Sequence, residues 1–424
     1  MIEIQPLDNI DITLEVPGSK SLTQRALIAA SLAEGTSQLM GPLESEDTEY
    51  SSGALMQMGV IIEKDKDWQI KGNGGEIAPS IQPVFLGNNG TATRFLTSVV
   101  GLGHSSYTID GDKRMYERPI APLMSALKGW GVDITSIHGT GCPPLRVNAN
   151  GLQGGTTILP EGKSSQYLSS LLLVAPYAKS PATLIVEGEV LSKPYVAMTL
   201  SVMADFGIVV ECEADYSSFS IPQGCYKGRT YRIEGDASNA SYFWAAAAIT
   251  GGRVGVSNVP VPSLQGDSML VPLLGRMGCE ISKVGDGLSL KGPRQLTGIT
   301  VDMGDMPDVV PTLAVVAAFA EGKTVINNIA HLRIKECDRL SAVVTELTKL
   351  GVKVEEREAS MIIHGEGGRG LRGAEIETYE DHRMAMSMAV AGLRVAGVKI
   401  TGENCVAKSF PDFWQRFALL KGSV

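Results

Sequence analysis

The residues best suited to chemistry are cations placed just after turns, at the starts of helix-like segments. In Pro17-Gly18-Ser19-Lys20-Ser21 an extended segment ends at a Pro-Gly turn, and an Ala- and Leu-rich segment follows Arg25. Free backbone N–H groups and the helix dipole favour an anion at such a start. The order of residues is not that of a nucleotide-binding P-loop, which requires Gly-Lys-Ser/Thr. The stretch therefore predicts a phosphate or carboxylate site, with a solvated basic helix start as the alternative.

Six further cations fall in loops or at expected helix starts. They are Arg94, Arg118, Lys335, Arg339, Arg383 and Lys408. Arg94 follows a glycine-bracketed loop whose backbone can approach a ligand closely. Lys335 and Arg339 are four residues apart and are expected to share one helical face. Each cation alone is compatible with a solvated side chain, but guanidinium groups bind phosphate and carboxylate in bidentate fashion. Together they predict substrates with several negative charges, a task that needs no metal.

Few carboxylates accompany these cations. Asp308 is expected in the first turn of a helix, where it could be only a partner of the helix dipole. Glu336 lies between Lys335 and Arg339 and could be only a salt-bridge partner. Asp236, by contrast, reads as an ordinary helix cap. Asp308 and Glu336 are candidates for proton transfer because they sit among groups that otherwise favour anions.

Composition limits the class of protein. The chain has 424 residues, a net charge of −9 and a pI near 5.3, which argues against a nucleic-acid-binding protein. No apolar run reaches the ~18 residues of a membrane span, and no signal-peptide pattern opens the chain. The six cysteines are scattered and the five histidines lack metal-site spacing. We expect a cytoplasmic protein, a monomer, with no metal and no cofactor.

An internal repeat organises the chain. An apolar helical run recurs roughly every 70 residues, a length that fits a small βαβαββ module. The six runs begin at Arg25, Arg94, Tyr167, Tyr242, Pro311 and Met384. The sequence thus predicts an α/β (α+β) fold of two similar lobes, each built of three such repeats, with the active site in a cleft between lobes.

A second signature marks the exit from a helix into a strand. It is a glycine at the position that allows a left-handed turn, and it occurs at Gly59, Gly131, Gly207, Gly278 and Gly351. Five copies for six repeats suggest that the N-terminal strands complete the last repeats. Lobe one is then residues 16–232, and lobe two is residues 1–15 together with 233–424.

At this point the motifs resemble those of the 5-enolpyruvylshikimate-3-phosphate synthase family over essentially the whole chain. The matching stretches include Pro17-Gly18-Ser19-Lys20-Ser21, Leu86-Gly87-Asn88, Gly90-Thr91-Ala92, Glu117-Arg118-Pro119-Ile120, Ser164-Ser165-Gln166, Ser192-Lys193-Pro194-Tyr195, Lys335-Glu336, Asp338-Arg339 and Asp381-His382-Arg383-Met384. The resemblance implies a transferase of the shikimate pathway, which serves chorismate and aromatic amino acid biosynthesis.

The resemblance also implies residue roles. For shikimate 3-phosphate the implied residues, mainly on lobe one, are Lys20, Ser21, Arg25, Ser164, Ser165, Gln166, Ser192, Tyr195, Asp308, His331 and Lys335. For phosphoenolpyruvate they are Lys20, Asn88, Gly90, Thr91, Arg94, Arg118, Gln166, Arg339, Arg383 and Lys408. The implied proton carriers are Asp308, Glu336, Lys20 and His382. His331 departs from the family pattern, because many members have Asn at that position.

The implied reaction adds the 5-hydroxyl of shikimate 3-phosphate to phosphoenolpyruvate, giving a tetrahedral intermediate that loses phosphate. One alternative is a UDP-N-acetylglucosamine enolpyruvyl transferase, whose reactive loop carries a cysteine that is absent from Asp112–Pro119. Another is a non-catalytic protein that binds phosphorylated metabolites. Against the latter, Asp308 and Glu336 would repel such ligands unless the chemistry required them.

Overall fold

The computed structural model describes residues 1–8, 10–162 and 164–421. It divides into two compact units, one of Gly18–Ile233 and one of Met1–Pro17 with Glu234–Val424. The sequence-based boundaries lay one or two residues earlier at each crossing. Residues 422–424, the end of the second predicted lobe, lie outside the described residues.

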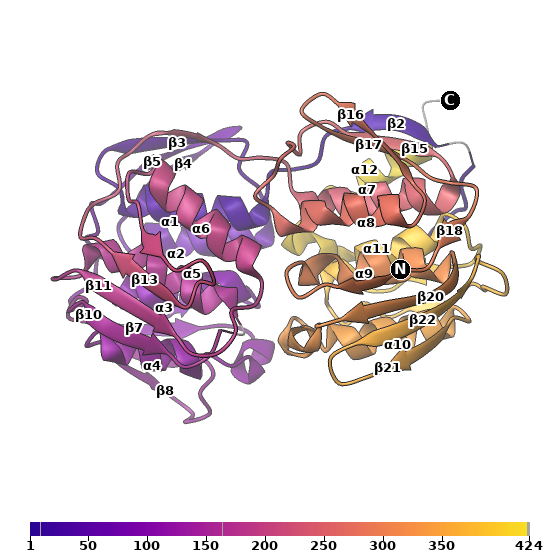
Figure 1. Ribbon diagram of the computed structural model, residues 1–424. Helices are drawn as coiled ribbons and strands as arrows, with labels where there is room; N and C mark the ends of the chain where they lie inside the picture. The colour runs from indigo at the N-terminus through magenta and orange to yellow at the C-terminus, as the bar shows by residue number, and fades with distance from the viewer. Residues whose placement is uncertain (9, 163, 422–424) are drawn as a thin grey trace. The chain divides into compact units, whose positions relative to one another are not determined.

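The unit Gly18–Ile233 contains three four-stranded sheets, drawn from purple to magenta in Figure 1. Their strand orders are β14-β3-β5-β4, β6-β7-β9-β8 and β10-β11-β13-β12. The strands are β3 (Thr36–Met40), β4 (Ile61–Lys64), β5 (Asp67–Lys71), β6 (Val84–Phe85), β7 (Ser106–Asp110), β8 (Asp133–Ser136), β9 (Leu145–Asn148), β10 (Gly155–Leu159), β11 (Ala182–Val186), β12 (Glu211–Cys212), β13 (Ser218–Ile221) and β14 (Thr230–Arg232). The helices are α1 (Lys20–Leu32), α2 (Glu46–Gln57), α3 (Gly90–Val100), η1 (Lys113–Glu117), α4 (Ala121–Gly129), α5 (Ser165–Val174), η2 (Ala175–Tyr177) and α6 (Lys193–Asp205).

The other unit, which holds the orange and yellow elements of Figure 1, also has three sheets, of four, five and three strands. Its sheets are ordered β16-β17-β15-β2, β18-β20-β22-β21 with β19 beside β20, and β1-β24-β23. The strands are β1 (Ile2–Glu3), β2 (Asp11–Leu14), β15 (Arg253–Val256), β16 (Glu280–Val284), β17 (Gly287–Lys291), β18 (Leu296–Thr297), β19 (Thr300–Asp302), β20 (Ala320–Asn327), β21 (Lys353–Glu356), β22 (Met361–Glu366), β23 (Glu375–Ile376) and β24 (Lys399–Ile400). The helices are α7 (Ala237–Thr250), η3 (Gly266–Met269), α8 (Leu270–Arg276), η4 (Pro307–Val309), α9 (Val310–Ala318), η5 (Ala330–Ile334), α10 (Arg339–Lys349), α11 (His382–Gly392), η6 (Glu403–Lys408), α12 (Phe413–Ala418) and η7 (Leu419–Lys421).

The βαβαββ repeat is complete in the stretch from β10 to β13. Strands β10 and β11 flank α5 and pair in parallel, and β12 and β13 form an antiparallel hairpin after α6. In the first and fourth repeats the opening strand comes from elsewhere in the chain, since β14 pairs in parallel with β3 and β2 with β15. The sixth repeat is completed by β1, which runs antiparallel to β24. The N-terminal segment therefore supplies strands to two sheets, those of the fourth and sixth repeats.

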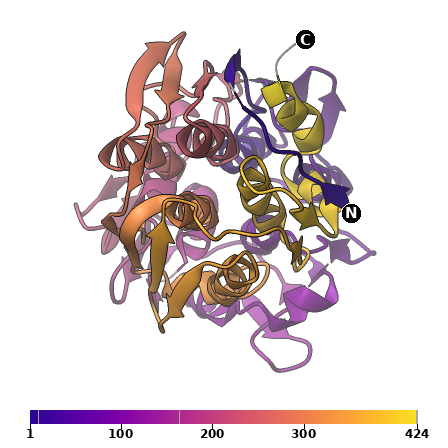
Figure 2. The same cartoon turned by 90° about the vertical axis from the view of Figure 1, so that its right-hand side faces the viewer.

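The first helix of each repeat is buried at the centre of its unit. Helices α1, α3 and α5 contact one another, and so do α7, α9 and α11, with the sheets around them. Figure 2 views the helices of the orange and yellow unit nearly end-on, with strands outside them. Nearly all residues of these six helices are buried, and a helix that is covered on all sides has no face that must be polar. Among the described helices, none combines the length and apolarity that crossing a membrane demands.

The predicted glycine exits are confirmed. At Gly59, Gly131, Gly207, Gly278 and Gly351 the φ angles are +94°, +86°, +96°, +112° and +95°. An L side chain is strained in this region of φ, so glycine allows each chain segment to turn from helix to strand at a low conformational cost.

The pairing of the N-terminal segment predicts a local effect of Ile4→Ala. The Ile4 side chain is buried beside Gly392 of α11, and its backbone N–H donates to Val398. Truncation should lower the free energy of unfolding by about 2–4 kcal/mol. Hydrogen exchange should accelerate in α11 and β24. The matched control is Leu39→Ala in β3, which should accelerate exchange in the unit Gly18–Ile233 instead. Unchanged exchange in α11 after Ile4→Ala would contradict the pairing.

Candidate active site

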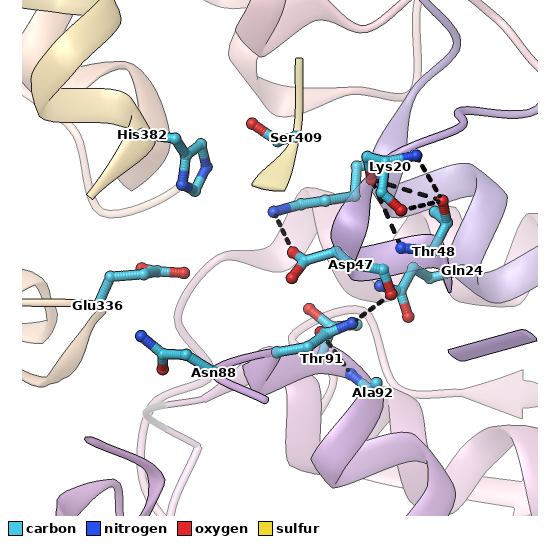
Figure 3. Close-up of polar contacts among 12 residues, drawn as sticks. Lys20, Gln24, Asp47, Thr48, Asn88, Thr91, Ala92, Glu336, His382 and Ser409 are labelled. Atoms are coloured by element: carbon cyan, nitrogen blue, oxygen red, sulfur yellow. Dashed lines mark hydrogen bonds and ion pairs between the residues drawn. The ribbon is translucent and has the colours of Figure 1, made fainter. Parts of the chain in front are cut away.

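In the unit Gly18–Ile233, the starts of four helices converge through side-chain hydrogen bonds. Lys20 Nζ lies 3.0 Å from Asp47 Oδ2 at the start of α2, a contact visible in Figure 3. Asn89 caps α3 by accepting from the Ala92 N–H at 2.9 Å, and its Nδ2 donates to the Asp47 carbonyl at 2.6 Å. Gln166 of α5 donates to Thr91 Oγ1 of α3 at 3.1 Å. The sequence-predicted Lys20, Thr91 and Gln166 thus belong to one cluster of helix starts.

Arg25 is buried with its positive charge intact. Its guanidinium donates to Thr199 Oγ1 at 2.7 Å, Ser169 Oγ at 3.2 Å and the carbonyls of Ser21 and Tyr195 at 2.9 and 3.2 Å. All four acceptors are neutral, and within the described part of the chain no carboxylate pairs with Arg25. Burial lowers the pKa of Arg25 to about 10, which leaves it protonated at neutral pH. An uncompensated buried cation attracts an anion strongly.

Arg94 and Arg118 flank the start of α3. Arg94 is 4% exposed and donates to the carbonyls of Gly90 and Pro119 at 3.2 and 2.8 Å. Arg118 donates to the side chain of Asn88 at 3.1 Å. Gly90 lies directly against this guanidinium, and a Cβ at that position would overlap it. The glycine therefore makes the room in which Arg118 lies.

The predicted serine and tyrosine residues come from the starts of α5 and α6. Ser164 is the N-cap residue of α5, and Ser165 is its first, buried residue. Ser192 precedes α6 in a left-handed conformation, with φ of +56°. The Tyr195 ring lies 5.8 Å from the Arg25 guanidinium carbon. A left-handed serine is uncommon and occurs more often at functional sites than elsewhere.

In the other unit, a buried ion-pair network is centred on Arg339. Its Nε and Nη2 bind Asp381 in bidentate fashion, at 2.6 and 3.2 Å. Nη1 lies 3.0 Å from Asp308 and Nη2 lies 2.7 Å from Glu336. Arg339 is only 1% exposed, and Asp381 is fully buried. Three carboxylates share this one guanidinium, and two of them, Asp308 and Glu336, are the carboxylates that the sequence singled out.

Asp308 also bridges to a second arginine. Arg383 Nη2 lies 2.6 Å from Asp308 Oδ2, and Arg383 Nη1 donates to Tyr242 Oη at 3.5 Å. Burial alone would raise the pKa of Asp308, but Arg383, Lys335 and Arg339 outweigh it and hold this pKa well below its usual range. Asp308 is therefore ionised at neutral pH, and an ionised carboxylate is the form that can accept a proton.

Lys335 and Arg339 do not share a helical face. Lys335 ends η5 in an extended conformation, while α10 begins only at Arg339. The cause is Asp338, whose side chain accepts from the Ser341 N–H at 3.0 Å and caps α10. Both cations still act on Asp308, but from separate elements.

His331 lies in η5, 7% exposed, and neither ring nitrogen has a hydrogen-bond partner among the described residues. Burial, followed by the charge of Lys335, lowers the pKa of His331 to about 4 against the opposing effect of Asp308. The imidazole is therefore neutral at physiological pH, with one N–H available as a donor. An N–H donor at this position would suit the role that the family resemblance implied for His331, which is to bind shikimate 3-phosphate. Many family members have Asn, another N–H donor, at this position.

The remaining predicted residues also belong to this unit. His382 is the first residue of α11 and is fully buried, with Nδ1 3.8 Å from Asp381 Oδ1. Lys408 ends η6 and is 7% exposed. Within the described residues, no group of three or more His, Cys, Asp or Glu side chains has the geometry of a metal site.

Sequence reasoning missed two carboxylates as members of the site: Asp47 and Asp381. Asp47 and Asp381 lie at helix starts, where an aspartate reads as a cap, and Asp381 does cap α11 by accepting from the Arg383 N–H at 2.9 Å. For Asp381, the sequence offered one signal, because Arg383 follows two residues later at the same helix start. For Asp47 it offered none, because Lys20 belongs to another helix.

Two units of βαβαββ repeats that gather cations and carboxylates at buried helix starts define an α/β enzyme for anionic small molecules. The family model described as EPSP synthase (3-phosphoshikimate 1-carboxyvinyltransferase) matches residues 4–417. A protein of Trichormus variabilis named 3-phosphoshikimate 1-carboxyvinyltransferase is 45% identical over 417 residues, 97% of each chain. One of the same name from Syntrophobacter fumaroxidans is 43% identical over 420 residues, 99% of each chain.

Solved structures agree with the sequence comparisons. EPSP synthase from Acinetobacter baumannii superposes with a TM-score of 0.81 at 30% identity, over 97% of this chain and 96% of that one. The chain belongs to the EPSP synthase family.

The neutral, buried state of His331 predicts a pH effect on stability. Because its folded pKa of about 4 lies below the ordinary histidine value of 6.5, the unfolded chain binds the proton first as the pH falls. The native protein should therefore lose up to about 3 kcal/mol of unfolding free energy between about pH 6.5 and about pH 4 through this residue. His331→Asn should remove that loss in urea titrations, whereas His104→Asn, at an exposed position, should retain it. Parallel curves for native protein and His331→Asn would contradict the assignment.

Proposed function

We propose that this chain transfers the carboxyvinyl group of phosphoenolpyruvate to the 5-hydroxyl of shikimate 3-phosphate and releases phosphate. Membership of the EPSP synthase family makes it a transferase of aromatic amino acid biosynthesis. The observation that best supports the chemistry is Asp308, an ionised carboxylate held between Arg339 and Arg383. The Asp308 carboxylate can accept a proton, and the two guanidinium groups that can bind an anion lie within hydrogen-bond distance of it.

Shikimate 3-phosphate is assigned mainly to the unit Gly18–Ile233. The buried, uncompensated charge of Arg25 supports this assignment, because a phosphate dianion would neutralise it. The hydroxyl and amide groups proposed to complete this site belong to Ser21, Ser164, Ser165, Gln166, Ser192 and Tyr195. Lys20 contributes from the start of α1, and Asp308, His331 and Lys335 contribute from the other unit.

Phosphoenolpyruvate carries a carboxylate and a phosphate, so it needs cations in two places. Arg339 and Arg383 are the cations proposed for one end, with Lys408. Arg94, Arg118 and Lys20 are proposed in the other unit, where the backbone at Gly90 and the side chains of Asn88, Thr91 and Gln166 complete the contacts.

The charge network suggests how Asp308 becomes a base when it is needed. In the structure described here, Arg383 and Arg339 hold the pKa of Asp308 low, and a weakly basic carboxylate accepts a proton poorly. Anionic substrates compete for the same guanidinium groups. Once they bind, Asp308 loses part of its stabilisation and its proton affinity rises. Asp308 then takes the proton of the 5-hydroxyl as its oxygen attacks C2 of phosphoenolpyruvate.

The methylene carbon must gain a proton in the first step and lose one in the second. Glu336, with its carboxylate 2.7 Å from Arg339, and Lys20 are the proposed carriers, and His382 assists. The cations that bind the phosphate stabilise it as it leaves. One acid–base set thus serves both directions of proton transfer.

Two alternatives are less well supported. A UDP-N-acetylglucosamine enolpyruvyl transferase would be expected to carry the reactive-loop cysteine. A non-catalytic binding protein leaves the three carboxylates around Arg339 without a purpose. Incubation with both substrates and measurement of phosphate release separates these functions. Only the proposed enzyme releases the phosphate of phosphoenolpyruvate when shikimate 3-phosphate is the acceptor.

We further propose a monomeric protein of the cytoplasm. The cysteines described are all free, in keeping with a reducing compartment. Size-exclusion chromatography with light scattering tests the monomer, which corresponds to a mass of 45.0 kDa.

Asp308→Asn tests the base directly. The amide is nearly isosteric and cannot accept the proton, so kcat should fall by about 10²- to 10⁴-fold. Affinity for shikimate 3-phosphate, measured by calorimetry, should persist or increase because a negative charge is removed. The control is Asp286→Asn, an exposed carboxylate of the same unit, which should leave kcat unchanged. A kcat within a few-fold of the native value in Asp308→Asn would assign proton transfer to Glu336 and Lys20.

Gly90→Ala tests the position of Arg118. The new methyl group would overlap the guanidinium and displace it. The KM for phosphoenolpyruvate should rise by about tenfold or more, as expected for the loss of one charged contact, while the KM for shikimate 3-phosphate changes little. Gly53→Ala in α2 is the control, because a Cβ there meets nothing within 4 Å. An unchanged KM for phosphoenolpyruvate would remove Arg118 from its binding site.

A further inference from the structure

Asp267 is a buried carboxyl group that the proposed mechanism does not use. It lies in η3, which packs against α7 and η4, and it is 2% exposed. Its Oδ2 bonds to the hydroxyl of Ser238 in α7. Its Oδ1 is buried and has no hydrogen-bond partner in the described residues. An ionised carboxylate with one oxygen unsatisfied is costly to bury, whereas a protonated one is far less so.

Three charged groups act on Asp267, each from a different element. Asp308 approaches from η4, Arg383 from α11 and Asp236 from the N-cap of α7. Burial is the largest effect, and with the charge of Asp308 it raises the pKa of Asp267 to about 7, against the opposing effects of Arg383 and Ser238. The two neighbouring carboxylates of the same network thus differ in state. Asp308 is ionised, and Asp267 holds a proton below neutral pH.

We propose that Asp267 is a positioning residue. Its protonated, neutral carboxyl group does not offset the positive charge of Arg383, which pairs with Asp308 and is then available to the anionic substrate. An ionised Asp267 would add a second negative charge that acts on Arg383. Its charge would weaken the attraction of Arg383 for an incoming carboxylate or phosphate. The proton on Asp267 therefore sets how strongly this unit attracts anions. The inference rests on the proposed function in so far as Arg383 binds phosphoenolpyruvate.

The first measurement needs no substrate. Because the folded pKa lies above the ordinary value of 3.8, the folded state keeps a proton that the unfolded chain has lost between about pH 4 and about pH 7. As the pH rises across that range, native protein should lose stability relative to Asp267→Asn. The urea midpoint of native protein minus that of Asp267→Asn should therefore fall, and it should level off above about pH 7. A difference that does not change with pH would overturn the proposal.

The second measurement separates positioning from a purely structural role. In native enzyme, the KM for phosphoenolpyruvate should rise roughly five- to tenfold between about pH 6 and about pH 8, with a smaller change in kcat. Asp267→Asn should remove this rise. Titration of the substrate phosphate affects both proteins equally, so the ratio of their KM values isolates Asp267. Parallel KM profiles would overturn the positioning role.

Ser238→Ala gives an independent variant. The hydroxyl favours the ionised form of Asp267, so its removal should shift the rise in KM to higher pH. An unshifted rise would count against Asp267 as the titrating group. Failure of the native protein to release phosphate at any pH would instead contradict the proposed function, and the urea series would still decide the protonation of Asp267.

Discussion

A buried guanidinium group cannot remain without partners, and much of this structure follows from that constraint. Arg339 is 1% exposed, and its donors are taken by Asp381, Asp308 and Glu336. Removing any one carboxylate would leave one of these donors without its acceptor in a medium of low polarity. In this structure, Arg339 and Arg383 are therefore paired with carboxylates of the protein itself. These carboxylates occupy the positions that substrate anions are proposed to take.

The fold makes this pairing possible by bringing helix starts together. The inner helices are buried and contact one another within each unit, and side-chain hydrogen bonds and ion pairs connect several of their N-termini. Each start adds partial positive charge and free N–H groups. The two units use this differently. Arg25 keeps neutral partners in one, while Arg339 and Arg383 are matched with carboxylates in the other.

Much of this could be predicted from the sequence. The six inner helices, the glycine exits and the family all follow from local patterns, since an alanine-rich run or a left-handed glycine carries its structural meaning with it. The carboxylate partners could not be predicted in the same way. Asp47 and Asp381 look like helix caps, and nothing in the sequence around Asp267 indicates that it is buried beside Asp308. Those facts depend on which helix starts meet, which is a tertiary property.

The expectation about Lys335 failed for a related reason. A spacing of four residues is meaningful only inside a helix, and the Asp338 cap starts α10 after Lys335.

In the proposed mechanism, substrate anions displace the carboxylates from Arg383 and Arg339. The most direct test is a crystal structure with shikimate 3-phosphate and a non-reactive phosphoenolpyruvate analogue. We predict that the contact of 2.6 Å between Arg383 Nη2 and Asp308 Oδ2 is broken and that Arg383 binds the analogue. An intact Arg383–Asp308 pair, with the analogue bound elsewhere, would contradict the account.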